Sequence, residues 1–152
     1  MEETADRMFS PRMIKRYIDR RLSAELEGIG VNTSWVPFLG EIHRSPGISM
    51  KGLASNMMVD KALVTRTVQK MMDTGLVIDE GEGHAYILRL TDKGEEAAAI
   101  AREVIDSAWA SLLRDLTEEE KEVLRRIDDK IMNVIKEDSA CSSSTSGRSI
   151  TQ

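Results

Sequence analysis

Apolar residues recur every three or four positions through several stretches of the chain, which is the spacing of one buried helix face. Each of these stretches begins at a residue that can cap a helix with its side-chain oxygen. The pattern predicts four helices before residue 76, capped in turn by Ser10, by one of residues 32–34, by Ser49 and by Asp60. Pro11 fits the first turn of the first helix, and Gly28, Gly30 and Gly75 supply helix ends.

The pattern changes between residues 76 and 90, where a β-hairpin is predicted. Residues 76–78 (Leu-Val-Ile) form a short β run, residues 80–83 (Glu-Gly-Glu-Gly) have the composition of a turn, and residues 85–90 are predicted to form the returning strand. A long helix is expected after residue 93, and a last helix begins at the capping box of Thr117 and Glu120. Residues 1–9 are expected to be a flexible N-terminus and residues 139–152 a disordered, Ser-rich tail.

The predicted fold class is therefore mainly α with a small β-hairpin (α+β). Two helices joined by residues 58–60 and followed by a hairpin are the parts of a winged helix-turn-helix. A helix of this kind fits the major groove of DNA, where its exposed side chains reach base edges. The first helix and the last two carry apolar stripes wider than one small lobe can cover, which predicts a helical dimerisation lobe.

Composition narrows the possible functions further. The 152 residues are enough for one domain, and they include no run of about 18 apolar residues and no signal peptide. The expected location is the cytoplasm, with no membrane partner. One cysteine and two histidines make a zinc site an unfavourable interpretation, and no catalytic set of residues is recognised. We therefore expect no enzyme activity, no metal and no cofactor.

The net charge of -5, taken as a total, argues against a nucleic-acid partner, but the charge is unevenly distributed. Residues 1–93 are neutral, whereas residues 94–138 carry 7 basic and 13 acidic side chains. Residues 48–72 hold four basic side chains against Asp60 alone. The acidity therefore belongs to the predicted dimerisation helices, and the predicted DNA-binding helices carry a modest positive charge.

Several short motifs resemble the MarR family of winged helix-turn-helix transcriptional regulators. They are Ile48-…-Leu53-Ala54, Val59-Asp60-Lys61-…-Val64-Thr65-Arg66, Gly75-Leu76-Val77 and Leu90-Thr91-Asp92-Lys93-Gly94. The resemblance covers residues 10–138 and implies a homodimer, with residues 10–30 and 94–138 as the dimerisation lobe and residues 31–93 as the DNA-binding lobe. It also implies a pseudo-palindromic operator in double-stranded DNA and, usually, repression. In many members a small, often phenolic, ligand between the lobes releases the DNA.

The resemblance also assigns residues to the DNA contact. They are Ser49 and Lys51 at the phosphate backbone, Lys61, Ala62, Thr65, Arg66 and Lys70 on the recognition helix, and His84 in the wing. Arg66 could read guanine with two hydrogen bonds or hold a phosphate. Lys61 stands at a helix start, where the helix dipole also favours a phosphate. Taken alone, these cations would be interpreted as a solvated helix face. The ligand-binding residues cannot be assigned, since the family's pocket has no fixed motif.

The wing departs from the family pattern. Where the family commonly has Asp-x-Arg before the second strand, this chain has Glu82-Gly83-His84, and Asp79 stands where a basic residue is frequent. Because phosphates repel acidic side chains, we expect this wing to contribute less to DNA binding than in typical relatives. An alternative function follows from the same feature, namely a winged-helix protein–protein interaction module that does not bind DNA strongly.

Three residue types have alternative interpretations. The methionines are interpreted as core filler rather than metal ligands, since thioether side chains adapt to irregular gaps. Trp35 and Trp109 could line a ligand pocket, but both lie on apolar stripes, which favours plain packing. Cys141 could sense oxidants, although its place in the predicted tail leaves no positive neighbour to activate it.

Overall fold

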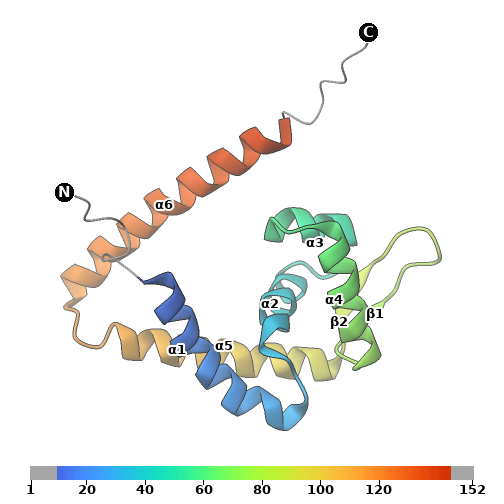
Figure 1. Ribbon diagram of the computed structural model, residues 1–152, viewed down its shortest axis with the longest axis horizontal. Helices are drawn as coiled ribbons and strands as arrows, with labels where there is room; N and C mark the ends of the chain where they lie inside the picture. Colours follow the sequence, from blue (N-terminus) through green and yellow to red (C-terminus); the bar gives the residue numbers. More distant parts are fainter. Residues whose placement is uncertain (1–9, 145–152) are drawn as a thin grey trace. The chain divides into compact units, whose positions relative to one another are not determined.

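The computed structural model of the chain describes residues 10–144 (Figure 1). The chain divides into two compact units, one running to Ser111 and the other from Leu112 onward. The first unit holds α1 (Pro11–Leu26), α2 (Val36–Arg44), α3 (Met50–Met57), α4 (Lys61–Asp73), β1 (Val77–Asp79), β2 (Leu88–Leu90) and nearly all of α5 (Asp92–Leu112). The second holds α6 (Glu118–Ser144). Short 3-10 helices precede α2 and follow α1, at Thr33–Trp35 and Glu27–Ile29. The predicted fold class is confirmed.

Most helices begin where the sequence places their caps, but α2 begins at Val36, after a 3-10 turn that Asn32 caps, and not directly after one of residues 32–34. The Ser10 hydroxyl accepts a hydrogen bond from the Met13 amide, and Pro11 occupies the first turn of α1. The Asp60 carboxylate caps α4 by accepting a hydrogen bond from the Ala62 amide at 2.7 Å. Such caps satisfy amides that have no partner inside the helix, so local sequence alone determines these starting points.

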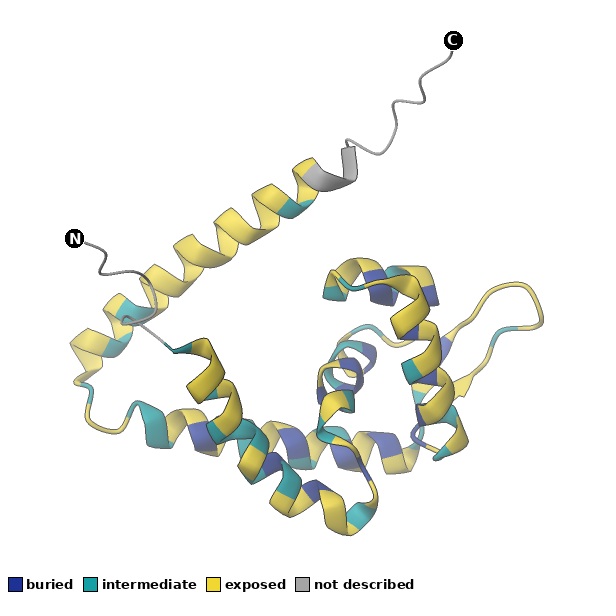
Figure 2. Cartoon of the chain, viewed as in Figure 1, coloured by how far each residue is buried: buried dark blue, intermediate teal, exposed yellow. Residues whose placement is uncertain are grey.

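The core of the first unit lies where its helices meet, and Figure 2 shows the buried positions facing inward. Its fully buried side chains are mostly large and aliphatic: Leu26, Leu39, Ile42, Leu53, Met71, Leu76, Leu88, Val64, Val68 and Val77. Ala97 and Ala101 of α5 belong to the same cluster, as does Leu22 of α1. Helices α1 and α5 therefore share one core with the winged helix, although the sequence assigns them to a different lobe.

The wing is a two-stranded antiparallel sheet in which Val77 pairs with Leu90 and Asp79 with Leu88. Both strands have three residues, so the prediction of a strand over residues 85–90 was wrong for residues 85–87. The Asp79 side chain explains the difference, because it accepts hydrogen bonds from the amides of Gly81 and Ile87. A side chain that takes backbone amides in this way competes with the strand ladder.

A close approach of two backbones joins α5 to the wing. A Cβ atom at residue 94 would lie only 2.1 Å from the carbonyl oxygen of Leu76, so Gly94 is the residue that allows this contact. The Thr91 hydroxyl accepts a hydrogen bond from the Gly94 amide and donates one to the Gly75 carbonyl oxygen. The start of α5 is therefore fixed against the end of α4 and the start of β1.

The second unit is an amphipathic helix that begins at the predicted capping box. The Thr117 amide donates to Glu120, and the Glu120 amide donates to Thr117. The prediction that residues 139–144 are disordered was wrong, because α6 continues to Ser144. No proline or glycine interrupts residues 139–144, and the Ser139 hydroxyl donates to the carbonyl oxygen of Ile135 within the helix. The rest of the predicted tail and the predicted flexible N-terminus lie outside the described residues.

Some packing predictions hold and others fail. Met50 and Met71 are buried, and Trp35, Met57 and Met72 pack against the core as partly buried side chains. Met58, in contrast, is exposed at the turn between α3 and α4, where its φ of 54° is left-handed. Trp109 is 40% exposed, so the packing expected for it is incomplete among the described residues. Cys141 lies exposed on α6 and not in a disordered tail.

Candidate nucleic-acid interface

Helices α3 and α4 form the helix-turn-helix that the sequence predicts. The Ser49 hydroxyl caps α3 by accepting a hydrogen bond from the Gly52 amide at 3.0 Å. Residues 58–60 make the turn, and the amides of Met58 and Val59 donate to carbonyl oxygens at the end of α3. Because both helix starts are capped and the turn is closed by backbone hydrogen bonds, the orientation of α4 relative to α3 is fixed.

Helix α4 has one face in the core and one face in solvent. Val64, Val68 and Met71 are fully buried at the spacing of one helix face. The opposite face carries the side chains of Ala62, Thr65, Arg66 and Gln69, all of which are exposed. Sequence reasoning assigned the first three of these to DNA and missed Gln69, although its spacing of three residues from Arg66 is the signal for a shared face.

The basic side chains on these two helices are available for a ligand. Lys51, Lys61, Arg66 and Lys70 are exposed, and none of them forms an ion pair with any residue between 10 and 144. Their charges are therefore not neutralised by nearby carboxylates of the described chain. Such a group of unneutralised cations on one helix-turn-helix can attract and hold phosphate groups.

The helix starts contribute unequally to this surface. Ser49 uses its oxygen as an acceptor toward Gly52, which leaves its hydroxyl proton free to donate to a phosphate. At the start of α4, the Asp60 carboxylate already binds the Ala62 amide. A phosphate contact by Lys61 would therefore depend on its ammonium group more than on the helix dipole, which the sequence prediction had included.

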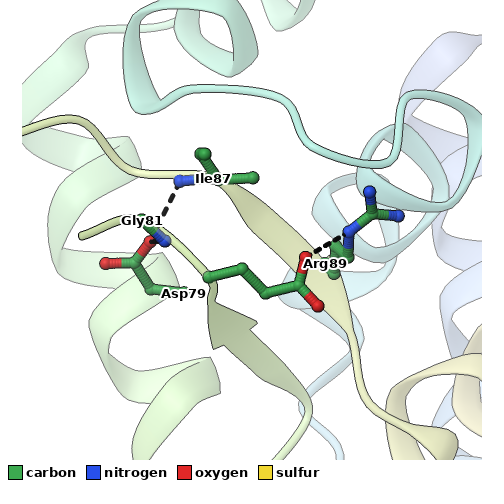
Figure 3. A network of polar contacts seen from close by, with 5 residues as sticks. Asp79, Gly81, Ile87 and Arg89 are labelled. Carbon is green, nitrogen blue, oxygen red and sulfur yellow. Dashed lines mark hydrogen bonds and ion pairs between the residues drawn. The ribbon is translucent and has the colours of Figure 1, made fainter.

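Two acidic residues of the wing, Asp79 and Glu80, are held in polar contacts within the hairpin (Figure 3). One oxygen of Asp79 accepts hydrogen bonds from the amides of Gly81 at 2.8 Å and Ile87 at 2.9 Å. Glu80 pairs with Arg89 across the hairpin, with 2.5 Å between Oε2 and Nε. Arg89 is thus a wing cation that sequence reasoning missed, and its charge is balanced by a carboxylate. His84 is exposed in the loop between the strands.

A groove of about 730 Å³ lies among α2, α3 and α5, and sequence reasoning assigned none of its residues. Its apolar lining includes Val36, Met57 and Ile105, and small residues such as Ala98 leave the space open. A concave, mainly apolar site with a few polar groups at its edge is the usual form of a small-molecule site. These residues are scattered over three helices, which explains why no linear motif indicated the groove.

A pair and a group of three polar side chains line this groove. His43 of α2 lies 2.6 Å from Glu95 of α5, measured from Nδ1 to Oε2. The Arg44 guanidinium and the Asn56 amide donate to the two oxygens of Glu41, and these hydrogen bonds lower the pKa of Glu41 from its ordinary value. Glu41 is therefore ionised near neutral pH, and its charge is matched by Arg44.

Within residues 10–144, no three His, Cys, Asp or Glu side chains are grouped so that they could hold a metal ion. No helix in this range combines the length and the apolar character needed to cross a bilayer.

Comparisons with known proteins identify the fold and the family. The MarR family model matches residues 29–85, which include α2, α3, α4 and the start of the wing. The HTH-type transcriptional regulator BilQ of Clostridium symbiosum is 30% identical over 104 residues, covering 66% of this chain and 72% of the relative.

Two solved structures share the fold. A putative MarR family regulator of Listeria monocytogenes, crystallised with a 26mer DNA, has a TM-score of 0.76 at 19% identity and covers 100% of both chains. A MarR family protein of Mycobacterium tuberculosis in complex with salicylic acid has a TM-score of 0.63 at 23% identity, covering 86% of this chain and 99% of that one. The family model, the sequence identity to BilQ and the winged helix agree, and this chain belongs to the MarR family of winged helix-turn-helix transcriptional regulators.

Proposed function

We propose that the protein is a cytoplasmic, homodimeric repressor that binds a pseudo-palindromic operator and releases it when a small molecule, such as a phenolic compound, binds. The observation that carries the DNA-binding part is the group of unneutralised cations on α3 and α4, beside a solvent-facing stripe on α4. The Listeria structure with DNA supports the same use of this fold.

The dimer is supported by apolar surface that this chain leaves uncovered. On α6, Ile127, Ile131 and Val134 lie on one face and are 45%, 51% and 56% exposed. Trp109 near the end of α5 is also exposed. Burying a large aliphatic side chain stabilises an assembly by roughly 1.5–3 kcal/mol, so several of them on one helix favour association. A second copy of the same chain presents the same uncovered face and is the partner we propose.

The dimer explains how two recognition helices reach one operator. Two copies related by a two-fold axis would place their α4 helices in successive major grooves, about 34 Å apart. A ligand that binds better to a different spacing of the two helices lowers DNA affinity by the ratio of its affinities for the two states.

The ligand part is supported by the groove among α2, α3 and α5. The salicylic acid complex of the Mycobacterium tuberculosis protein supports the general chemistry of a small aromatic effector. Salicylate is therefore a suitable first probe. Salicylate should weaken operator binding by the wild type. Ala98→Leu, which fills part of the groove, should remove that response and leave operator affinity in the absence of salicylate unchanged.

The main test is selection of bound sequences from a random DNA pool by the purified full chain. A palindromic consensus with half-sites about one helical turn apart is the expected result. Sedimentation at micromolar concentration should give about twice the chain mass for the wild type, and Ile131→Asp should shift it toward the monomer. No enriched sequence, or a wild type that stays monomeric, would overturn the proposal.

A second candidate function is a protein–protein interaction module that binds DNA weakly. It is favoured by the wing, where acidic Asp79, Glu80 and Glu82 stand near exposed Tyr86. Salt separates the two candidates, because each neutralised phosphate contributes about one unit to the slope of log affinity against log salt. A steep slope, together with a loss of affinity in Arg66→Ala, supports DNA binding. DNA affinity that changes neither with salt nor with Arg66→Ala favours the interaction module.

A further inference from the structure

The exposed face of α4 presents an ordered set of chemical groups. Ala62, Thr65 and Arg66 occupy positions i, i+3 and i+4 and therefore form one patch, opposite the buried Val64 and Val68. We call these three residues the α4 patch. Because the rise of an α-helix is 1.5 Å per residue, the patch extends about 6 Å along α4, which corresponds to less than two steps of a DNA duplex.

The N-terminal half of the α4 patch is apolar on its outer side. Ala62 contributes only a methyl group. The Thr65 hydroxyl donates to the carbonyl oxygen of Lys61 at 2.9 Å, so its proton is used within the helix. What remains for an external partner is the Thr65 methyl group and an acceptor oxygen. Two methyl groups on one helix face match the 5-methyl group of thymine, the apolar feature of the major groove.

The other half of the α4 patch is a single guanidinium. Arg66 forms no ion pair or hydrogen bond with another described side chain, whereas Arg44 is paired with Glu41 and Arg89 with Glu80. A guanidinium with all its donors unused can make two parallel hydrogen bonds to O6 and N7 of guanine. The position of Arg66 on the same face as two methyl groups favours base reading over a phosphate contact at the edge of the helix.

The next turn of α4 is less suited to base contacts. The Gln69 amide donates to the Asp73 carboxylate at 3.3 Å, and both side chains are exposed. This hydrogen bond occupies one donor of Gln69, and the Asp73 charge would repel phosphates on either side of the groove. Sequence reading is therefore concentrated in the first two turns of α4.

We propose that each operator half-site contains a thymine read by the methyl groups of Ala62 and Thr65 and, within two base pairs, a guanine read by Arg66. This inference rests on the proposed function, because it assumes that α4 enters the major groove. It adds the chemical identity of two bases, which neither the family nor the fold determines.

The experiment uses the operator obtained by selection with the full chain. Deoxyuridine replaces thymidine at the proposed position, which removes the 5-methyl group and leaves base pairing intact. The wild type should bind the uracil duplex about three- to fivefold more weakly, as expected for one lost methyl contact. Replacing the guanine by 7-deazaguanine removes the N7 acceptor and should weaken binding about five- to tenfold for the wild type, but not for Arg66→Ala.

Two matched variants of Thr65 identify the group that reads the thymine. Thr65→Val keeps a methyl group and loses the hydroxyl, so its preference for thymine over uracil should equal that of the wild type. Thr65→Ser keeps the hydroxyl and loses the methyl group, so its preference should fall below about twofold. Thermal unfolding of all variants verifies that they are folded.

The outcomes separate this inference from the proposed function. A palindromic consensus that lacks thymine and guanine within two base pairs, or a wild type that does not distinguish thymine from uracil, overturns the base assignment and leaves DNA binding intact. A preference retained by Thr65→Ser and lost by Thr65→Val overturns the methyl contact. Failure of selection to enrich any sequence overturns the proposed function itself.

Discussion

Helix α4 and the wing are adjacent in the sequence, but they differ in whether their charged side chains are paired within the described chain. On α4 the basic residues Lys61, Arg66 and Lys70 have no carboxylate partner within the described chain. In the wing, Glu80 neutralises Arg89, and Asp79 uses its carboxylate to hold the loop. The difference shows that a count of charged residues does not measure the surface available to DNA. The relevant quantity is charge that no neighbour has already neutralised.

Among the substitutions that test this comparison, Arg66→Ala is expected to change operator affinity most. Arg66→Ala should weaken operator binding by roughly 1–3 kcal/mol, or about 5- to 150-fold, because a two-bonded contact to a base is lost. Arg89→Ala removes the same side chain from the wing and should change the affinity less than about twofold. Fluorescence anisotropy with one operator duplex measures both. Equal losses for the two variants would show that the ion pair in the wing does not keep Arg89 from DNA.

A smaller effect is expected from Lys70, and it concerns salt. Lys70→Ala should weaken binding similarly on all sequences and reduce the slope of log affinity against log salt by about one unit. Glu80→Gln is the matched wing variant, and its slope should not fall, because it removes no cation. Titrations at four or five salt concentrations give the slopes. A slope unchanged by Lys70→Ala would place that lysine away from the phosphates.

Replacing Asp79 tests whether the wing carboxylate serves the stability of the hairpin or the contact with DNA. Asp79→Ala removes the acceptor of two hydrogen bonds and should lower the free energy of unfolding by about 1 kcal/mol, since each solvent-exposed bond contributes little. Operator affinity should stay within about twofold of the wild type if the wing makes few DNA contacts. Urea unfolding and a binding titration on the same preparation measure the two quantities. A large loss of affinity with unchanged stability would make Asp79 part of the DNA surface.

His84 is predicted to have the smallest effect. His84 is exposed in the loop between the strands, close in sequence to the acidic Glu80 and Glu82. His84→Ala should therefore change operator affinity by less than about twofold, because acidic side chains keep this loop away from phosphates. Gel-shift titrations with one operator duplex measure the difference. A loss of affinity well above twofold would mean that the wing does engage DNA.

Local sequence was sufficient to place most helix boundaries. The caps at Ser10, Ser49 and Asp60 and the capping box at Thr117 were all predicted and confirmed. These predictions hold because a cap joins groups only two or three residues apart, so nothing distant can change it. The position of Ala62, Thr65 and Arg66 on one face of α4 follows from helical spacing for the same reason.

Predictions that depend on distant partners were less successful. The returning strand is shorter than predicted because the Asp79 carboxylate accepts the hydrogen bond of the Ile87 amide, eight residues later in the chain, which strand pairing would otherwise use. The core methionine interpretation fails at Met58, where the turn between two helices directs the residue outward. The groove residues could not be assigned, since they come from three helices whose packing no local pattern specifies.

The sequence by itself determined the order of the elements, the caps, the winged helix and the family, because these depend on short-range spacing and on motifs. Only the tertiary structure decided which charges are neutralised, since the partners Glu80 and Arg89 meet across a hairpin and His43 and Glu95 across two helices. The tertiary structure also decided that Ile131 and Trp109 are exposed among residues 10–144. Neutralisation and burial depend on distances between residues far apart in sequence, and folding sets those distances.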